Sequence, residues 1–296
     1  MKYNSAASFR TALEQRLNTQ SQETGAPLMR FRKLVVFDRL MARLLVVAPS
    51  RWILKGGVAL HFRVGTQFRT TKDLDLGRED NQEAATADFL SAQSVDLGDH
   101  FAFVIERTEQ LDSANESNTV RYHVTAQIAG RTFEEITVDV GFGEQIFAEP
   151  EALRGPELLT FADITPVEVP ALPLADHIAE KLHAYTRDYP GGKPSTRVKD
   201  LIDLAIISSL FSMNASRLRK SMESTFTSRA THPLPEEFPL PPSDWRVPYQ
   251  RMAKEVDLEP DFKVGYELVR AFLDPILATA CQDEGEWDPT TGSWHW

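Results

Sequence analysis

The sequence of 296 residues has little cysteine, and Cys281 is its single thiol. One cysteine cannot form an internal disulfide or bind zinc tightly alone, which excludes a disulfide-stapled domain and a cysteine-based zinc site. The sequence also lacks a run of about 18 apolar residues, and its polar start contains no apolar signal region. We therefore expect a cytoplasmic protein that does not span a membrane and is not exported by a signal peptide.

The composition is that of a folded protein, with 42% hydrophobic and 25% charged residues. At roughly 150 residues per domain, the length predicts about two domains. A proline-marked linker with Pro166, Pro170 and Pro173 separates a mixed first part from a helical second part. We predict an α+β domain with a mixed sheet and basic N-terminal helices over residues 1–170, and a mainly helical domain over residues 171–296.

The spacing of apolar residues predicts the individual elements. Helices are expected over residues 28–47, 58–64, 83–93 and 261–280, and strands over residues 51–54, 73–76, 101–107, 119–128 and 133–140.

Charge is distributed unevenly along the chain, whose net charge is −11. Residues 1–72 carry a net charge of +10, and residues 73–180 a net charge of −18. Part of the positive charge lies on the amphipathic helix predicted over residues 28–47, which includes Arg39 and Arg43. We expect this basic block to bind RNA, whereas the alternative is that its arginines keep the helix soluble or bind an acidic partner protein.

Two carboxylates, Asp73 and Asp75, alternate with leucines in a predicted strand. A strand directs residues i and i+2 to one face, so both acids project away from the core. Asp139 occupies a similar position in the strand predicted over residues 133–140, and it would join them if the two strands are neighbours. Three carboxylates suit a pair of Mg²⁺ or Mn²⁺ ions that hold a nucleoside triphosphate. The alternative is a set of solvated acids on a strand face.

The segment Lys55-Gly56-Gly57 ends one predicted strand and opens a helix. Glycines at such a point allow the first free N–H groups of a helix to approach a phosphate closely. A simple tight turn would show the same pair of glycines. The order of Gly-Gly, then Asp-x-Asp, then a third aspartate is more specific, and it is the arrangement of DNA polymerase β type nucleotidyltransferases, which this region resembles.

Four segments in order narrow the resemblance to the AbiEii family of nucleotidyltransferase-like toxins, which belong to type IV toxin–antitoxin systems and include mycobacterial toxins of the MenT type. The similarity covers residues from about 30 to 250. The segments are WILKGGVAL (residues 52–60), RTTKDLDL (69–76), HIAEKLHA (177–184) and RVKDLIDL (197–204). Many members carry serine at the position of Thr71, which keeps the hydroxyl.

The resemblance implies transfer of a nucleoside monophosphate from a triphosphate, such as the pyrimidine CTP, to RNA. The expected acceptor is the 3′ end of tRNA, the expected effect is a block of translation and growth, and the expected partner is a cognate antitoxin. It also implies that Lys181 holds the triphosphate together with Lys55, Gly56, Gly57 and Thr71, in a cleft that the helical domain closes.

Residue type alone is consistent with a purely structural role for Lys181 and Asp203 at the protein surface. A lysine flanked by core positions often extends to solvent, and Asp200 and Asp203 would lie on a salt-bridged solvent face of their helix. The resemblance instead makes Asp203 the residue that orients Lys181 or the incoming hydroxyl, with Asp200 as second choice.

Further phosphate or RNA contacts are expected from cations near these motifs, namely Arg63, Arg69, Lys72 and Arg197. Two other functions remain open from the sequence. One is a non-catalytic RNA- or protein-binding toxin whose triphosphate site has decayed. The other is a phosphotransferase of the haloacid-dehalogenase type, which also uses Asp-x-Asp, although there the motif should end an apolar strand.

Overall fold

The computed structural model describes residues 1–65, 68–110, 118–143, 149–187, 197–278 and 284–296. Cys281 lies outside the described residues. The chain divides into two compact units. Unit 1 comprises Met1–Gly65 and Thr70–Leu172, and unit 2 comprises Thr66–Arg69 and Pro173–Trp296. Arg69, four residues before the Asp-x-Asp motif, therefore belongs to unit 2, whereas Thr71 and Lys72 belong to unit 1.

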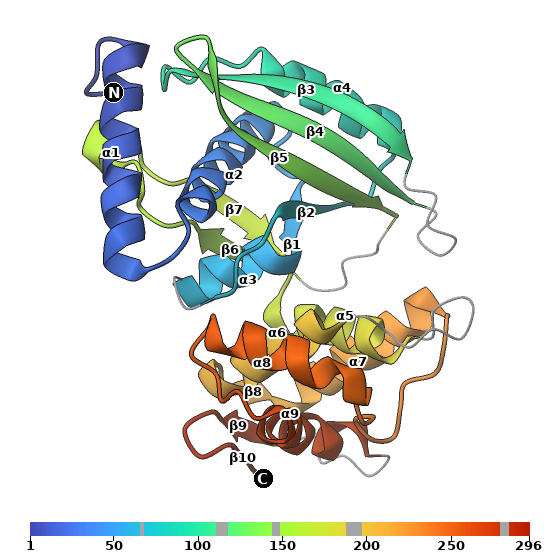
Figure 1. Cartoon of the computed structure of the whole chain (residues 1–296). Helices are drawn as coiled ribbons and strands as arrows, with labels where there is room; N and C mark the ends of the chain where they lie inside the picture. The colour runs from blue at the N-terminus through green and yellow to red at the C-terminus, as the bar shows by residue number, and fades with distance from the viewer. Residues whose placement is uncertain (66–67, 111–117, 144–148, 188–196, 279–283) are drawn as a thin grey trace. The chain divides into compact units, whose positions relative to one another are not determined.

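Unit 1 is built on a mixed sheet of seven strands within the described residues, in the order β3-β4-β5-β2-β1-β7-β6 (Figure 1). The pairs β2–β5 and β1–β7 are parallel, and the other neighbours are antiparallel. The strands are β1 (Ile53–Lys55), β2 (Asp73–Arg78), β3 (Phe101–Gln110), β4 (Thr119–Ile128), β5 (Arg131–Phe142), β6 (Glu151–Arg154) and β7 (Glu168–Ala171).

Helices complete unit 1, and α2 is the most enclosed of them, because it contacts α1, α4 and β5. The Ser5 side chain caps the N-terminus of α1, and Gly25 ends this helix in the left-handed conformation, where glycine has no Cβ penalty. The helices are α1 (Ala6–Thr24), α2 (Leu28–Val47), α3 (Gly56–Val64), α4 (Gln82–Gln93) and the 3₁₀ helix η2 (Thr160–Ala162).

Several predicted elements are present with the expected bounds. Helix α2 and strand β4 begin and end where the sequence pattern predicts. A two-residue turn, Ala129-Gly130, joins β4 to β5, and both residues have positive φ, as this hairpin type requires. The patterns do not predict β6 and β7, which are short and include Pro170, a residue without an N–H for the sheet ladder.

Unit 2 consists mainly of helices, with a small sheet of order β10-β9-β8. In the proline-rich segment, residues 231–242 form an ordered stretch without helix or strand, and Tyr185 and Tyr266 donate hydrogen bonds to its backbone carbonyls. Residues 243–248 of the same segment are helical. Its elements are α5 (Leu174–Thr186), α6 (Val198–Leu210), β8 (Met213–Asn214), α7 (Ala215–Arg229), η3 (Ser243–Trp245), α8 (Arg246–Lys254), α9 (Phe262–Leu277), β9 (Glu286–Asp288) and β10 (Ser293–His295).

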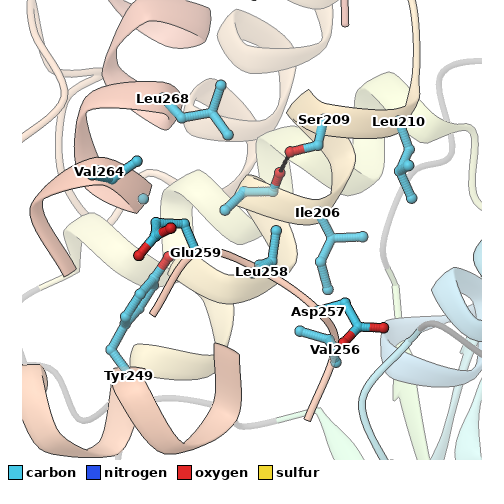
Figure 2. Close-up of a pocket in the computed structure, with 12 residues that line it drawn as sticks. Ile206, Ser209, Leu210, Tyr249, Val256, Asp257, Leu258, Glu259, Val264 and Leu268 are labelled. Atoms are coloured by element: carbon cyan, nitrogen blue, oxygen red, sulfur yellow. Dashed lines mark hydrogen bonds between the residues drawn. The ribbon is translucent and has the colours of Figure 1, made fainter. Parts of the chain in front are cut away.

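A cavity of about 290 Å³ lies in unit 2 between α6, α8, α9 and the segment that joins the last two. Figure 2 shows its mostly apolar lining, with Ser209, Tyr249, Asp257 and Glu259 as polar exceptions. The residues predicted to be functional are not among those that line it. Among the described helices, none is both long and apolar enough to cross a membrane.

Candidate active site

Two aspartates and two cations of unit 1 lie side by side in a row across four neighbouring strands. Arg121 on β4 is paired in register with Asp139 on β5, Asp139 with Asp75 on β2, and Asp75 with Lys55 on β1. Residues paired in register point to the same face of a sheet. We call Arg121, Asp139, Asp75 and Lys55 the carboxylate row; it places two acids side by side and a cation at each end.

Asp73 shares this face, because it precedes Asp75 by two residues on the same strand. Leu74 and Leu76 point the other way and are buried in the core, with exposed fractions of 0% and 2%. Asp73 and Asp75 remain partly exposed. Strands β2 and β5 are direct parallel neighbours, so the condition for the three aspartates to lie together is met.

Gly56 brings the first turn of α3 against Asp75. The helix begins at Gly56, directly after β1, and the φ of Gly56 is +61°. A Cβ atom built there would lie 1.8 Å from Asp75 Oδ2, so only glycine leaves room for the carboxylate. The first N–H groups of a helix have no partner inside the helix and carry positive partial charge. This geometry puts helix N–H groups, which are of a kind that can bind phosphate, directly beside a carboxylate, which is of a kind that can bind a metal ion.

Asp139 is held by an arginine that the sequence analysis did not single out. Arg121 Nε and Nη2 donate to Asp139 Oδ1 and Oδ2, each at 2.7 Å. These bonds, and the nearby charges of Asp139, Asp73 and Asp75, raise the pKa of Arg121 against the opposing effect of burial. The signal that could have found Arg121 is its register with Asp139, which strand pairing alone reveals.

Asp73 and Asp75 have the donor chemistry for a divalent cation, since Mg²⁺ and Mn²⁺ prefer carboxylate oxygens. Their common direction and the adjacent Gly56 turn fit a metal-bound triphosphate. Within the described part of the chain, no group of three His, Cys, Asp or Glu residues is arranged to hold a metal ion. The fit therefore rests on the β2 pair, and a metal role for Asp139 stays a prediction.

Thr71 lies just before β2, where its hydroxyl donates a hydrogen bond to the backbone carbonyl of Asp73 at 3.3 Å. Lys33 on α2 donates to the carbonyls of Lys72 and Glu135 at 3.1 and 3.2 Å. The first bond fixes the Thr71 hydroxyl beside the Asp-x-Asp motif. The two bonds from Lys33 link the residue before β2 to strand β5. A triphosphate contact from Thr71 remains a prediction.

Unit 2 holds a buried network of charges around Lys181. Lys181 Nζ donates to Asp203 Oδ2 at 2.5 Å and to Asp200 Oδ1 at 3.2 Å. Arg69 donates to both oxygens of Asp203 at 2.7 Å each, and Arg197 donates to Asp200 at 2.6 Å. Burial alone would raise the pKa of Asp203, but the charges and hydrogen bonds of Arg69 and Lys181 outweigh it and lower the pKa to about 2.

The network corrects the prediction that Asp200 and Asp203 lie on a solvent face. Their exposed fractions are 1% and 0%, and that of Lys181 is 7%. The physical reason is that α6 packs against α5, α8 and α9, so the helix is enclosed on more than its leucine stripe. Contact between Asp203 and Lys181 is present, which is the geometry that an orienting role needs.

Two arginines that were predicted to contact RNA are buried, so this prediction is wrong for them. Arg39 and Arg43 on α2 have exposed fractions of 5% and 1%. Arg39 pairs with Asp38, and Arg43 donates to both oxygens of Asp99 at 3.0 and 2.7 Å. Because α2 is enclosed by α1, α4 and β5, its arginine face is buried as well as its apolar face. These arginines hold unit 1 together and do not form a basic surface.

The remaining four candidates differ in what they contact. Arg63 is part-buried and donates to Glu151 at 2.8 Å and to the Leu172 carbonyl at 2.5 Å. Arg69 and Arg197 belong to the network around Lys181. Of the six predicted RNA contacts, all of which the structure describes, Lys72 is the one that is exposed.

The mixed sheet, the glycine turn and the paired aspartates on β2 are the features that the sequence analysis predicts for a nucleotidyltransferase. Residues 39–274 match the sequence model of the family described as "Nucleotidyl transferase AbiEii toxin, Type IV TA system". This match covers more than half of the chain. The chain therefore belongs to the AbiEii family of nucleotidyltransferase toxins, which form part of type IV toxin–antitoxin systems.

The solved structure of a nucleotidyltransferase toxin has a similar fold. MenT4, the nucleotidyltransferase toxin Rv2826c from Mycobacterium tuberculosis H37Rv, is similar with a TM-score of 0.52 and 20% identity, over 70% of this chain and 68% of that one. JHP933 from Helicobacter pylori gives a TM-score of 0.43 and 16% identity, over 80% and 81% of the two chains. A comparison with curated proteins finds no match.

Proposed function

We propose that this chain is a cytoplasmic toxin that transfers a nucleoside monophosphate from a nucleoside triphosphate to RNA with the help of Mg²⁺ or Mn²⁺. The observation that carries the proposal is the contact between the Gly56 turn and Asp75, beside Asp73 and Asp139. Phosphate-binding N–H groups and cation-binding carboxylates meet there, and nucleotidyl transfer needs both.

The reaction forms a bond between the 3′ oxygen of the RNA and the α-phosphorus of the triphosphate. The bond from that phosphorus to the bridging oxygen breaks, pyrophosphate leaves, and the hydroxyl proton passes to solvent. Asp73 and Asp75 would hold a divalent cation, which would neutralise charge on the triphosphate. The N–H groups after Gly56 and Gly57 and the Thr71 hydroxyl bind phosphate oxygens and hold the α-phosphorus in place.

Two lysines add positive charge for the triphosphate in this proposal. Lys55 ends β1 next to the glycine turn and lies in register with Asp75. Lys181 is the family's motif lysine, and Asp203 fixes the direction of its ammonium group through the 2.5 Å contact. A lysine held by a buried carboxylate loses little further freedom when it binds a phosphate, which favours binding.

The acceptor and the nucleotide follow from the family resemblance. We propose the 3′ end of tRNA as acceptor and a pyrimidine triphosphate such as CTP as donor. Extension of that end blocks aminoacylation and thereby translation and growth. A cognate antitoxin protein would control the toxin in the same cell.

The test is an isotope-transfer assay. The purified protein is incubated with tRNA, Mg²⁺ and each of the four α-³²P-labelled triphosphates, and label on the RNA is measured on a denaturing gel. We expect label from a pyrimidine triphosphate and no label after addition of EDTA. Absence of transfer with all four triphosphates and both Mg²⁺ and Mn²⁺ would overturn the proposal.

A further inference from the structure

The carboxylate row contains its own cation at the position where a second metal ion would bind. Three carboxylates of this kind suit two divalent ions. Here both oxygens of Asp139 accept hydrogen bonds from Arg121, at 2.7 Å each. The side chain of Asp139 is 18% exposed and that of Arg121 is 35% exposed, so the pair lies at the surface of the sheet but is not fully solvated.

Arg121 and Asp139 form a bidentate ion pair, which is a strong type of ion pair. A guanidinium fork that meets both oxygens of a carboxylate forms two parallel charge-assisted bonds and occupies two of the roughly four acceptor sites of that carboxylate. Strand register fixes the partners, since Arg121 and Asp139 lie directly opposite each other on β4 and β5. The charge of Arg121 also acts on Asp73 and Asp75, so it repels any cation that approaches the row.

We infer that Arg121 takes the place of a second metal ion at Asp139, so that Asp73 and Asp75 bind one divalent cation. This inference rests on the proposed function and deepens it. Arg121 is a positioning residue in this arrangement, because it holds Asp139 and sets the number of ions. A guanidinium stays protonated in proteins, so Arg121 neutralises charge but does not accept the proton of the RNA hydroxyl.

Metal counting tests the inference without any turnover. The full-length protein is freed of metal with EDTA, desalted and titrated with Mn²⁺ alone, and free Mn²⁺ is followed by its electron paramagnetic resonance signal. We expect one bound ion in the wild type. In Arg121→Gln, Asp139 is released and the repelling charge is gone, so we expect two bound ions, or one ion bound at least tenfold more tightly.

Matched variants separate this effect from a general change of charge. Arg121→Lys keeps the positive charge and should bind one ion. Arg154→Gln removes an exposed arginine that pairs with Glu168 elsewhere in unit 1, and it should also bind one ion. Asp139→Asn in the Arg121→Gln background should return the count to one. Circular dichroism spectra of all variants check that they are folded.

The outcomes distinguish this inference from the proposed function. A wild type that binds two ions and transfers nucleotides would overturn the inference and leave the proposed function standing. An unchanged count and affinity in folded Arg121→Gln would also overturn the inference. A wild type that binds no Mn²⁺ and transfers no nucleotide would overturn both.

Discussion

Replacement of Gly56 by alanine tests whether the contact between the helix turn and Asp75 is functional. An alanine Cβ at this position would lie 1.8 Å from Asp75 Oδ2, whereas real Cβ contacts are not shorter than 3.0 Å. The carboxylate must therefore move by about 1.2 Å, the difference between these two distances. A misplacement of about 1 Å in a catalytic arrangement can reduce the rate 10²-fold. We expect at least this loss of transfer activity in Gly56→Ala.

The backbone cost of the substitution must be separated from the displacement of Asp75. Gly56 has a φ of +61°, and an alanine there costs roughly 1–2 kcal/mol of strain, offset by about 0.4–1 kcal/mol from the lower entropy of the unfolded chain. The net loss is about 1 kcal/mol, or about 2 °C in melting temperature for a protein of this size. Gly98 provides the control, because its φ is +63° and nothing lies within 4 Å of its Cβ position.

The two variants are compared in the same isotope-transfer assay and in thermal melting. Gly98→Ala should melt about as early as Gly56→Ala from the shared backbone cost and retain wild-type transfer. Gly56→Ala should be folded at the assay temperature and nearly inactive. Equal activity of both variants would refute the idea that Asp75 must lie against the start of α3.

Four further predictions use other parts of the chain. Asp73→Ala and Asp75→Ala should each abolish transfer without unfolding the protein, because an exposed face loses repulsion together with a ligand; thermal melting and the transfer assay check this. Lys181→Ala should raise the KM for the triphosphate and leave RNA binding nearly intact, and a collapse of RNA binding in a filter assay with unchanged KM would contradict its role. Arg43→Met should lower the free energy of unfolding in urea by about 3–5 kcal/mol, because it leaves the buried carboxylate of Asp99 without its bidentate partner. Burial and the neighbouring Arg30 lower the pKa of His61 to about 3, so the unfolded state binds a proton below pH 6.5 and the folded state does not. Stability should therefore fall by about 1.6 kcal/mol between pH 6.5 and pH 5, and His61→Gln should remove this part of the slope.

Local patterns in the sequence were enough to predict the elements that carry the candidate site. Alternation of acids and leucines at Asp73 and Asp75 fixes both the strand and the face of each side chain, because a strand has a period of two. The helix over residues 28–47 and the strand over residues 119–128 are likewise matched by the structure. In each case the deciding interactions lie within a few residues of one another in the sequence.

Burial of charged residues could not be predicted in the same way. The spacing of α6 identifies the leucine face but gives no sign that the opposite face is covered too, because α8 and α9 lie far along the chain. Asp203 was therefore expected at the surface, and it is fully buried between Arg69 and Lys181. The partner of Asp139 was missed for a different reason, since Arg121 is assigned to it by the register of β4 and β5, which the spacing of apolar residues does not give.

The same argument explains why the charge of whole segments gave a poor guide to the binding surface. Residues 1–72 are strongly basic and residues 73–180 strongly acidic, which suggests two separate surfaces when they are counted along the sequence. In the folded unit 1, acids of the second segment pair with arginines of the first, as Asp99 does with Arg43 and Glu151 with Arg63. Such pairs neutralise each other inside the unit and leave little field for RNA. A cation that attracts RNA must remain exposed after folding, and Lys72, one residue before the Asp-x-Asp motif, meets that condition.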